Sequence, residues 1–205
     1  MIPKNEFNIP KNNLGWIELI TGCMFAGKTE EFIKRLNRHA YAKKNIITFK
    51  PIIDDRYSKE NVASHSGTKL ISSPVKDTNE LKKVFAKQNA INPIDVVGID
   101  EVQFFDEAIV DYINELADSG IIVIVTGLDK DFKCVPFKNV DRLLPLAEMV
   151  DKLTAICVKC GNFANRTQRI IDGKPAKWSS PLILVDGNDS YEARCRNCYI
   201  LNKEK

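Results

Sequence analysis

The chain has 205 residues, of which 44% are hydrophobic and 28% charged, which suits one core-forming domain with a small appendage. Its 30 basic and 27 acidic residues give a net charge of +3, and this near balance argues against a nucleic-acid-binding surface. No apolar run approaches the roughly 20 residues that span a bilayer, so we expect no membrane segment.

Residues 1–15 are polar and contain Pro3 and Pro10. They lack the apolar stretch of a secretory signal, so we expect a flexible N-terminal extension to which the sequence assigns no function. The default location is then the cytoplasm, where a reducing environment keeps cysteines as thiols or metal ligands.

Residues 16–43 have the order strand, glycine loop, helix. The loop matches G-x-x-x-x-G-K-[ST] and consists of Gly22, Cys23, Met24, Phe25, Ala26, Gly27, Lys28 and Thr29. This context predicts a P-loop, whose backbone amides and helix N-terminus bind phosphate. Lys28 would reach the β- and γ-phosphates of ATP, and the Thr29 hydroxyl would ligate Mg²⁺. The alternative is a glycine turn that caps a helix and leaves Lys28 in solvent.

The rest of the first 150 residues alternates between strand and helix patterns. We expect strands at 45–50, 70–73, 94–99 and 121–125, helices at 79–87, 107–117 and 140–149, and a polar loop at 54–68. This alternation predicts an α/β fold, a P-loop NTPase-like parallel sheet with helices on both faces, over residues 16–150.

Acidic residues follow several predicted strands, and the carboxyl ends of parallel strands meet at one edge of a sheet. Asp100 ends an apolar strand in the Walker B arrangement and would bind Mg²⁺. Glu101 comes next and could accept a proton from an attacking hydroxyl. The alternative for this pair is a solvated acidic turn. Asp54 and Arg56 follow the second strand, where Arg56 would stabilise a transferring phosphoryl group or form a surface ion pair.

Composition changes at residue 151 to cysteines, turn formers and basic residues, so we expect a domain boundary there. Residues 151–205 contain two C-x-x-C pairs, Cys157 with Cys160 and Cys195 with Cys198. Four thiolates fit tetrahedral structural Zn²⁺ and predict a small zinc-ribbon or lasso subdomain. Disulfides or free thiols are the alternatives.

Some of the apolar residues near the strand ends could line a flat pocket for a base, although by default each of them belongs to the core. They are Met24, Phe104, Phe105, Leu128 and Phe132. The loop between the two C-x-x-C pairs could close over such a site. Closure would exclude water and favour phosphoryl transfer to a second substrate over hydrolysis of ATP.

The motifs, in order, resemble those of the zinc-containing, cellular-type (type II) thymidine kinases. The matching segments are 22–29, 50–57, 64–65, 100–105, 127–132, 153–157 and 191–198. The resemblance covers roughly residues 16–200 and implies transfer of the γ-phosphoryl group of ATP to the 5′-hydroxyl of thymidine or deoxyuridine, in deoxynucleoside salvage for DNA synthesis. It also implies feedback inhibition by dTTP and a homotetramer.

The resemblance further implies roles for individual residues. Glu101 would be the general base, with Arg56 and Lys28 acting at the phosphates. The ATP site would consist of residues 22–29 with Asp54, Arg56, Asp100 and Gln103. The thymidine site would consist of Met24, Asp54, Phe104, Leu128, Phe132, Thr167, Leu184, Val185, Asp186, Gly187 and Tyr191.

Three positions bear on how well the chain fits the family pattern. Cys23 stands where the family commonly has proline or a small residue, and Val102 stands where glycine or valine occurs. Asp186 replaces the first of two lasso glycines. If that position requires positive φ, Asp186 is strained there, and we expect a modest change in thymidine affinity.

Two other classes of function remain possible from the residues alone. One is a P-loop ATPase or regulatory nucleotide switch whose zinc module binds a partner, although the N-K-x-D tetrad of switch GTPases does not occur. The other is a nucleic-acid-binding zinc module with an ATPase, against which the charge balance argues. The three classes differ in whether ATP turnover depends on a nucleoside, on nucleic acid or on neither.

Overall fold

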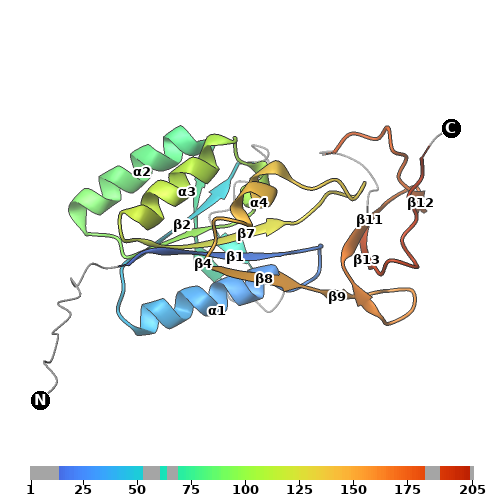
Figure 1. Ribbon diagram of the computed structural model, residues 1–205, viewed down its shortest axis with the longest axis horizontal. Helices are drawn as coiled ribbons and strands as arrows, with labels where there is room; N and C mark the ends of the chain where they lie inside the picture. The colour runs from blue at the N-terminus through green and yellow to red at the C-terminus, as the bar shows by residue number, and fades with distance from the viewer. Residues whose placement is uncertain (1–13, 53–60, 64–68, 183–189, 204–205) are drawn as a thin grey trace, which may run out of the picture.

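The computed structural model describes residues 14–52, 61–63, 69–182 and 190–203 (Figure 1). They form a layered α/β domain, and a smaller C-terminal lobe (residues 155–182 and 190–203) lies beyond one end of its sheet. Within the described chain, no helix is both long enough and apolar enough to cross a membrane.

The central sheet has six strands in the order β5-β2-β6-β7-β1-β8, and every pairing is parallel. Its strands are β1 (Trp16–Gly22), β2 (Ile46–Pro51), β5 (Ser73–Val75), β6 (Val96–Ile99), β7 (Ile122–Leu128) and β8 (Met149–Leu153). β6 is buried along its whole length and β7 along all but its last residue, which explains their continuous apolar sequences. The predicted parallel α/β fold is therefore confirmed.

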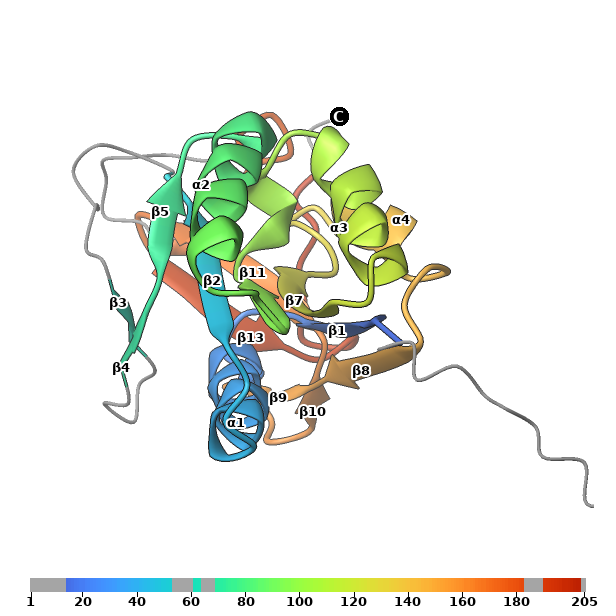
Figure 2. The ribbon, with the colours of Figure 1, turned by 90° about the vertical axis from the view of Figure 1, so that its left-hand side faces the viewer.

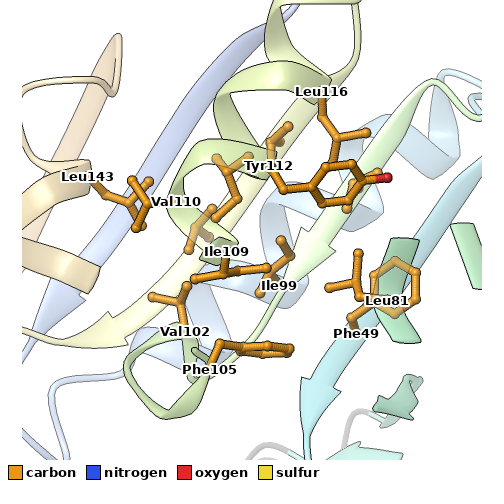
Figure 3. Packing of buried hydrophobic residues seen from close by; sticks show 14 of the residues in the cluster. Phe49, Leu81, Ile99, Val102, Phe105, Ile109, Val110, Tyr112, Leu116 and Leu143 are labelled. Carbon is orange, nitrogen blue, oxygen red and sulfur yellow. The ribbon is translucent and has the colours of Figure 1, made fainter. Parts of the chain in front are cut away.

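Helices cover both faces of this sheet. α1 (Lys28–Tyr41) packs on one face, and α2 (Thr78–Ile91), α3 (Ala108–Asp118) and α4 (Lys138–Leu143) lie on the other (Figures 1 and 2). The larger core lies between the sheet and α2–α4, where Phe49, Leu81, Ile99 and Ile109 pack together (Figure 3). The smaller core joins α1 to the sheet through Phe32 and other apolar residues.

Gly98 interrupts the apolar run of β6 for a steric reason. A Cβ atom at this position would lie 2.8 Å from Phe32 Cζ and 2.9 Å from Thr48 Cγ2. α1 therefore packs closely against β6 at this point, and a larger residue would push the helix away from the sheet.

The predicted helix over residues 140–149 is wrong in its second half. α4 begins earlier, at Lys138, and ends at Leu143. Pro145 follows, and it has no backbone N–H with which to continue the helical hydrogen bonds. The chain then forms β8, which pairs with β1 from Glu18↔Met149 to Gly22↔Leu153. The expected domain boundary at residue 151 thus lies inside a strand of the main sheet.

The other predicted elements differ from the observed helices and strands mainly at their ends. The region predicted as a polar loop contains β3 (Asn61–Ala63), which pairs with β4 (Lys69–Ile71) as an antiparallel hairpin. The single strand predicted at 70–73 is divided between β4 and β5, with Ser72 between them. The predicted N-terminal extension lies outside the described residues except for Leu14 and Gly15.

The C-terminal lobe contains short strands in two small sheets. They are β9 (Ala155–Ile156), β10 (Phe163–Ala164), β11 (Arg166–Ile171), β12 (Lys174–Pro175) and β13 (Ser190–Arg194). β9 follows β8 after a single residue, so the edge strand of the main sheet leads directly into the lobe.

Candidate active site

The P-loop begins where β1 ends. Gly22 has φ +144°, and a Cβ atom there would lie 2.4 Å from the Leu153 carbonyl oxygen, so both backbone conformation and space require glycine. Gly27 has φ +80° and caps α1, whose first-turn Glu31 amide donates to the Gly27 carbonyl over 3.1 Å. The loop therefore leads directly into a helix N-terminus, the arrangement that favours bound phosphate.

Lys28 lies inside this loop. Its side chain is buried, and its Nζ donates to the Cys23 carbonyl oxygen over 2.9 Å. Thr29 follows in the first turn of α1. The predicted phosphate-binding lysine and metal-binding hydroxyl therefore lie at the base of the loop, at the carboxyl end of β1.

Asp100 lies just after β6 and is buried. One of its carboxylate oxygens accepts hydrogen bonds from the Glu101 amide (3.0 Å) and from the Thr126 hydroxyl. Burial and the neighbouring charge of Glu101 raise the pKa of Asp100 to about 6, and Lys28 opposes this rise. A cation beside Asp100 would therefore stabilise its ionised form.

Glu101 adopts a left-handed backbone conformation with φ 53°. This conformation is uncommon for a residue with a Cβ atom and is often retained at functional sites. The Glu101 carboxylate accepts a hydrogen bond from the Gln103 amide, whose oxygen accepts from the Leu128 backbone N–H over 3.1 Å. Gln103 thus connects the ends of β6 and β7 through its side chain.

The ends of β1 and β7 are held together at the same edge. The Thr21 hydroxyl donates to the Gly127 carbonyl over 2.9 Å, and the Asp129 amide donates to the Gly22 carbonyl over 3.4 Å. Gly127 has no room for a side chain, since a Cβ atom would lie 2.8 Å from Val140 and 2.9 Å from Val102. The P-loop, residues 100–101 and residues 127–129 therefore lie at the same edge of the sheet.

The C-terminal lobe contacts the start of the P-loop. The Met24 amide donates to the Thr167 hydroxyl oxygen over 3.1 Å, and the Cys23 thiol donates to the Ala164 carbonyl over 3.4 Å. Both bonds join residues more than 140 positions apart in the chain. Residues of β10 and β11 therefore form one wall of the loop.

The four cysteines of the C-terminal lobe form one cluster. The sulfur atoms of Cys157, Cys160, Cys195 and Cys198 all lie within 4.8 Å of one another. All six cysteines of the chain are free thiols, so these pairs are not disulfides. Four thiolates at mutual distances of this size fit a tetrahedral zinc ion, whose Zn–S bonds are about 2.3 Å long, with no position left for substrate.

Comparison with known proteins agrees with these observations. A family model described as thymidine kinase matches residues 15–199. The chain belongs to the thymidine kinase family. It is 74% identical over 203 residues to the thymidine kinase of Mesoplasma florum, covering 99% of this chain and 100% of the relative.

Two further thymidine kinases come from mycoplasmas. That of Mycoplasma mycoides subsp. mycoides is 64% identical over 194 residues, covering 95% of this chain and 93% of the relative. That of Mycoplasma capricolum subsp. capricolum is 65% identical over 193 residues, covering 94% and 92%. The resemblance inferred from the ordered motifs is thus confirmed at the level of the family.

The residues expected to bind a base in this family do not all have the same surroundings. Met24 contacts Thr167, and Leu128 contacts Gln103, as described above. Phe132 is buried, and the Arg169 guanidinium lies 5.3 Å from its ring centroid. Phe104 packs edge-to-face on Phe137 at 6.1 Å, and Tyr191 pairs with Arg169 across β11 and β13.

Phe105 belongs to the larger hydrophobic core, which supports the core alternative for this residue. Asp54 and Arg56, and the lasso residues Leu184, Val185, Asp186 and Gly187, lie outside the described residues. Their expected roles stay predictions, as does the effect of Asp186.

Sequence reasoning missed three residues that the structure brings to this region. Thr126 donates to Asp100, and its signal was a polar residue at the end of a β-branched run. Arg169 is fully buried and donates to the Pro181 carbonyl over 2.5 Å, and the Tyr199 hydroxyl donates to the Phe132 carbonyl. Tyr199 has no sequence signal because its partner is 67 positions away, and no local pattern marks Arg169 as buried.

Proposed function

We propose that this thymidine kinase family member transfers the γ-phosphoryl group of ATP to the 5′-hydroxyl of thymidine, giving ADP and dTMP, and that it also accepts deoxyuridine. The observation that carries the proposal is Glu101, in a left-handed conformation beside the buried Asp100 and at the same sheet edge as the P-loop. A phosphate cradle with an adjacent carboxylate base is what phosphoryl transfer to a hydroxyl requires.

The P-loop, residues 22–29, would bind the phosphates of ATP through its backbone amides and Lys28. Thr29 and Asp100 would hold Mg²⁺, which neutralises phosphate charge when bound. The raised pKa of Asp100 supports this role, because a buried carboxylate next to another carboxylate gains from a nearby cation. Asp54 and Arg56 complete the proposed ATP site, with Arg56 stabilising the transferring phosphoryl group.

Glu101 would accept the proton of the 5′-hydroxyl as the new P–O bond forms and the bond from the γ-phosphorus to the β,γ-bridging oxygen of ATP breaks. Its carboxylate already accepts a hydrogen bond from Gln103, which would orient it toward the acceptor hydroxyl. Gln103, expected in the ATP site, would therefore act by holding the base.

Thymidine would bind between the P-loop side and the C-terminal lobe. The proposed contacts are Met24, Asp54, Phe104, Leu128, Phe132, Thr167, Leu184, Val185, Asp186, Gly187 and Tyr191. The Met24–Thr167 hydrogen bond supports this assignment, since it brings together one of these residues from the P-loop and one from the C-terminal lobe. The four clustered cysteines would hold structural zinc that keeps the lobe folded.

Three further properties are proposed from membership of the family: a homotetramer, inhibition by dTTP and a cytoplasmic location. Inhibition by dTTP is chemically reasonable, because one molecule carries both the thymine nucleoside and a triphosphate. The free thiols of all six cysteines suit a reducing compartment.

The test is ADP release from Mg²⁺-ATP with thymidine, deoxyuridine, deoxycytidine, deoxyadenosine, single-stranded DNA or nothing added. The proposal predicts turnover with thymidine, weaker or comparable turnover with deoxyuridine, and little with the other additions. Stimulation by DNA, or turnover that is the same with and without any addition, would overturn it and favour an ATPase.

A further inference from the structure

Three consecutive residues at the start of the P-loop are each held by the C-terminal lobe or by the strand that leads into it. Gly22 lies against the Leu153 backbone, with no room for a Cβ atom. The Cys23 thiol donates to Ala164 O, and the Met24 amide donates to Thr167 Oγ1. The start of the P-loop is therefore held at three consecutive positions by residues far away in the chain.

The contact at Cys23 is completely buried. Cys23 belongs to a small hydrophobic cluster in which every other buried member comes from the C-terminal lobe. Those members are Ala155, Cys157, Ala164, Ala193 and Cys195. Two of them belong to the four-cysteine cluster, so the P-loop packs directly against the proposed zinc site.

The members of this cluster are all alanines or cysteines, which bury little apolar surface each. Packing alone would stabilise such a cluster only weakly, and a metal bound to the four thiolates would stabilise its folded arrangement. The position of Cys23 should therefore depend on whether the four-cysteine cluster is intact.

Lys28 connects this contact to the phosphate site. The Cys23 carbonyl oxygen accepts from Lys28 Nζ, while the Cys23 thiol donates to the lobe. A displacement of Cys23 would therefore move the partner of the lysine that is proposed to bind ATP phosphates. The chain of contacts runs from the lobe through Cys23 to Lys28.

We propose that the C-terminal lobe positions the phosphate-binding loop through Thr167 and Cys23, so that nucleotide affinity depends on the lobe even without thymidine. This inference rests on the proposed function, in which the loop binds ATP. It gives the lobe a second task beside contacting the nucleoside, and it makes Thr167 and Cys23 positioning residues for the loop.

The test measures binding of Mg²⁺-ADP to the full, zinc-loaded chain by calorimetry, without thymidine. Thr167→Val removes the oxygen that accepts from Met24 while keeping the shape of the side chain. We expect its Kd for ADP to rise about 3- to 10-fold, the usual effect of losing one such hydrogen bond. Thr167→Ser keeps the oxygen and should bind ADP within about twofold of the unchanged chain.

Hydrogen exchange provides a second readout that does not depend on affinity. Amides of residues 22–29 should exchange faster in Thr167→Val than in Thr167→Ser, while β6 and β7 stay equally protected in both. Equal ADP affinity and equal loop exchange in the two variants would overturn the inference. If Thr167 only contacts thymidine, the Val variant will change the KM for thymidine alone.

A cysteine pair offers a matched comparison. Cys23→Ala removes the thiol that donates to Ala164, whereas Cys134→Ala removes a thiol outside the buried cluster. We expect weaker ADP binding only for Cys23→Ala. Equal affinity for ADP in the two variants would show that Cys23 does not position the loop.

Cys160→Ser tests the lobe itself, because Cys160 is an exposed member of the four-cysteine cluster. Zinc content should fall and ADP binding should weaken at least as much as in Thr167→Val, with the main sheet still protected from exchange. Unchanged ADP affinity in this zinc-depleted chain would contradict the inference. Failure of the unchanged chain to bind ADP would instead contradict the proposed function.

Discussion

The main sheet and the C-terminal lobe are stabilised in different ways. The sheet buries large apolar side chains on both faces, including Phe32 and Phe49, each fully inaccessible to solvent. The lobe leaves Phe163 77% exposed and Val158 60% exposed, and its buried cluster consists of alanines and cysteines. The sheet can therefore fold on hydrophobic burial, whereas the lobe needs a cross-link such as four thiolates on one zinc ion.

The two regions also divide the proposed chemistry. The edge of the sheet supplies Lys28, Asp100 and Glu101, and the lobe supplies Thr167 and Tyr191. A substitution in one region should therefore change different measurable properties from a substitution in the other.

The largest expected effect comes from removing a zinc ligand. Cys198→Ser should lower zinc content to near zero and unfold the lobe before the sheet, because structural zinc supplies most of the folding free energy of such small modules. Zinc analysis with hydrogen exchange of β11 and β13, compared with β6 and β7, measures this. Full activity of a zinc-free variant would contradict the claim that the lobe, unlike the sheet, depends on zinc for its folding.

Glu101→Gln should leave both regions folded and remove most of the chemistry. We expect kcat to fall about 100-fold or more, since the amide cannot accept the hydroxyl proton, with ADP affinity and thermal stability nearly unchanged. Steady-state kinetics and calorimetry on the same preparation check this. Near-normal kcat would exclude Glu101 as the base.

Asp100 gives the sheet a pH dependence that the variant Asp100→Asn should remove. The pKa of Asp100 is raised from 3.8 to about 6, so the folded chain holds this proton more tightly than the unfolded chain does. Ionised Asp100 therefore lowers stability progressively as the pH rises from about 4 to above 6, and the cost is constant at higher pH.

Without added Mg²⁺, Asp100→Asn should melt at a higher temperature than the unchanged chain at pH 8. Each 1 kcal/mol gained is worth about 2–4 °C in a protein of this size. At pH 4 the difference should largely disappear. Comparing the two chains at each pH cancels acid effects on the zinc cluster, and a difference that does not vary with pH would contradict the assignment.

The smallest effect is expected at the N-terminus of α2. The Asp77 side chain caps this helix by accepting from the Glu80 amide over 2.8 Å, and the Glu80 carboxylate accepts from the Lys76 amide over 2.7 Å. Asp77→Ala should cost about 1 kcal/mol of stability, and Asp77→Asn much less. Because α2 packs on the sheet, exchange in the lobe should stay unchanged in both variants.

Sequence patterns predicted the sheet domain well because its signals are local. The glycine loop with Lys28, the buried runs of β6 and β7, and the carboxylates after β6 are all readable within a few residues. The edge strand β8 escaped prediction because its residues are mostly exposed and its sequence is mixed. Hydrophobic periodicity cannot identify a strand that buries little of its surface.

In the lobe, the sequence predicted only the cluster of four cysteines. The two C-x-x-C pairs predicted this cluster. The contacts of Cys23 and Thr167, in contrast, join residues more than 140 positions apart in the chain. Such contacts depend on how the lobe packs against the sheet, which no local pattern encodes. The burial of Arg169 was missed because arginine side chains are usually exposed.

The most direct test of the central claim follows the γ-phosphoryl group itself. The chain is incubated with Mg²⁺-ATP and thymidine, and the phosphorus products are identified by ³¹P NMR. The proposed function predicts ADP and thymidine 5′-monophosphate in equal amounts, with little orthophosphate. Orthophosphate as the main product, or a phosphoryl group on the 3′-hydroxyl, would contradict it.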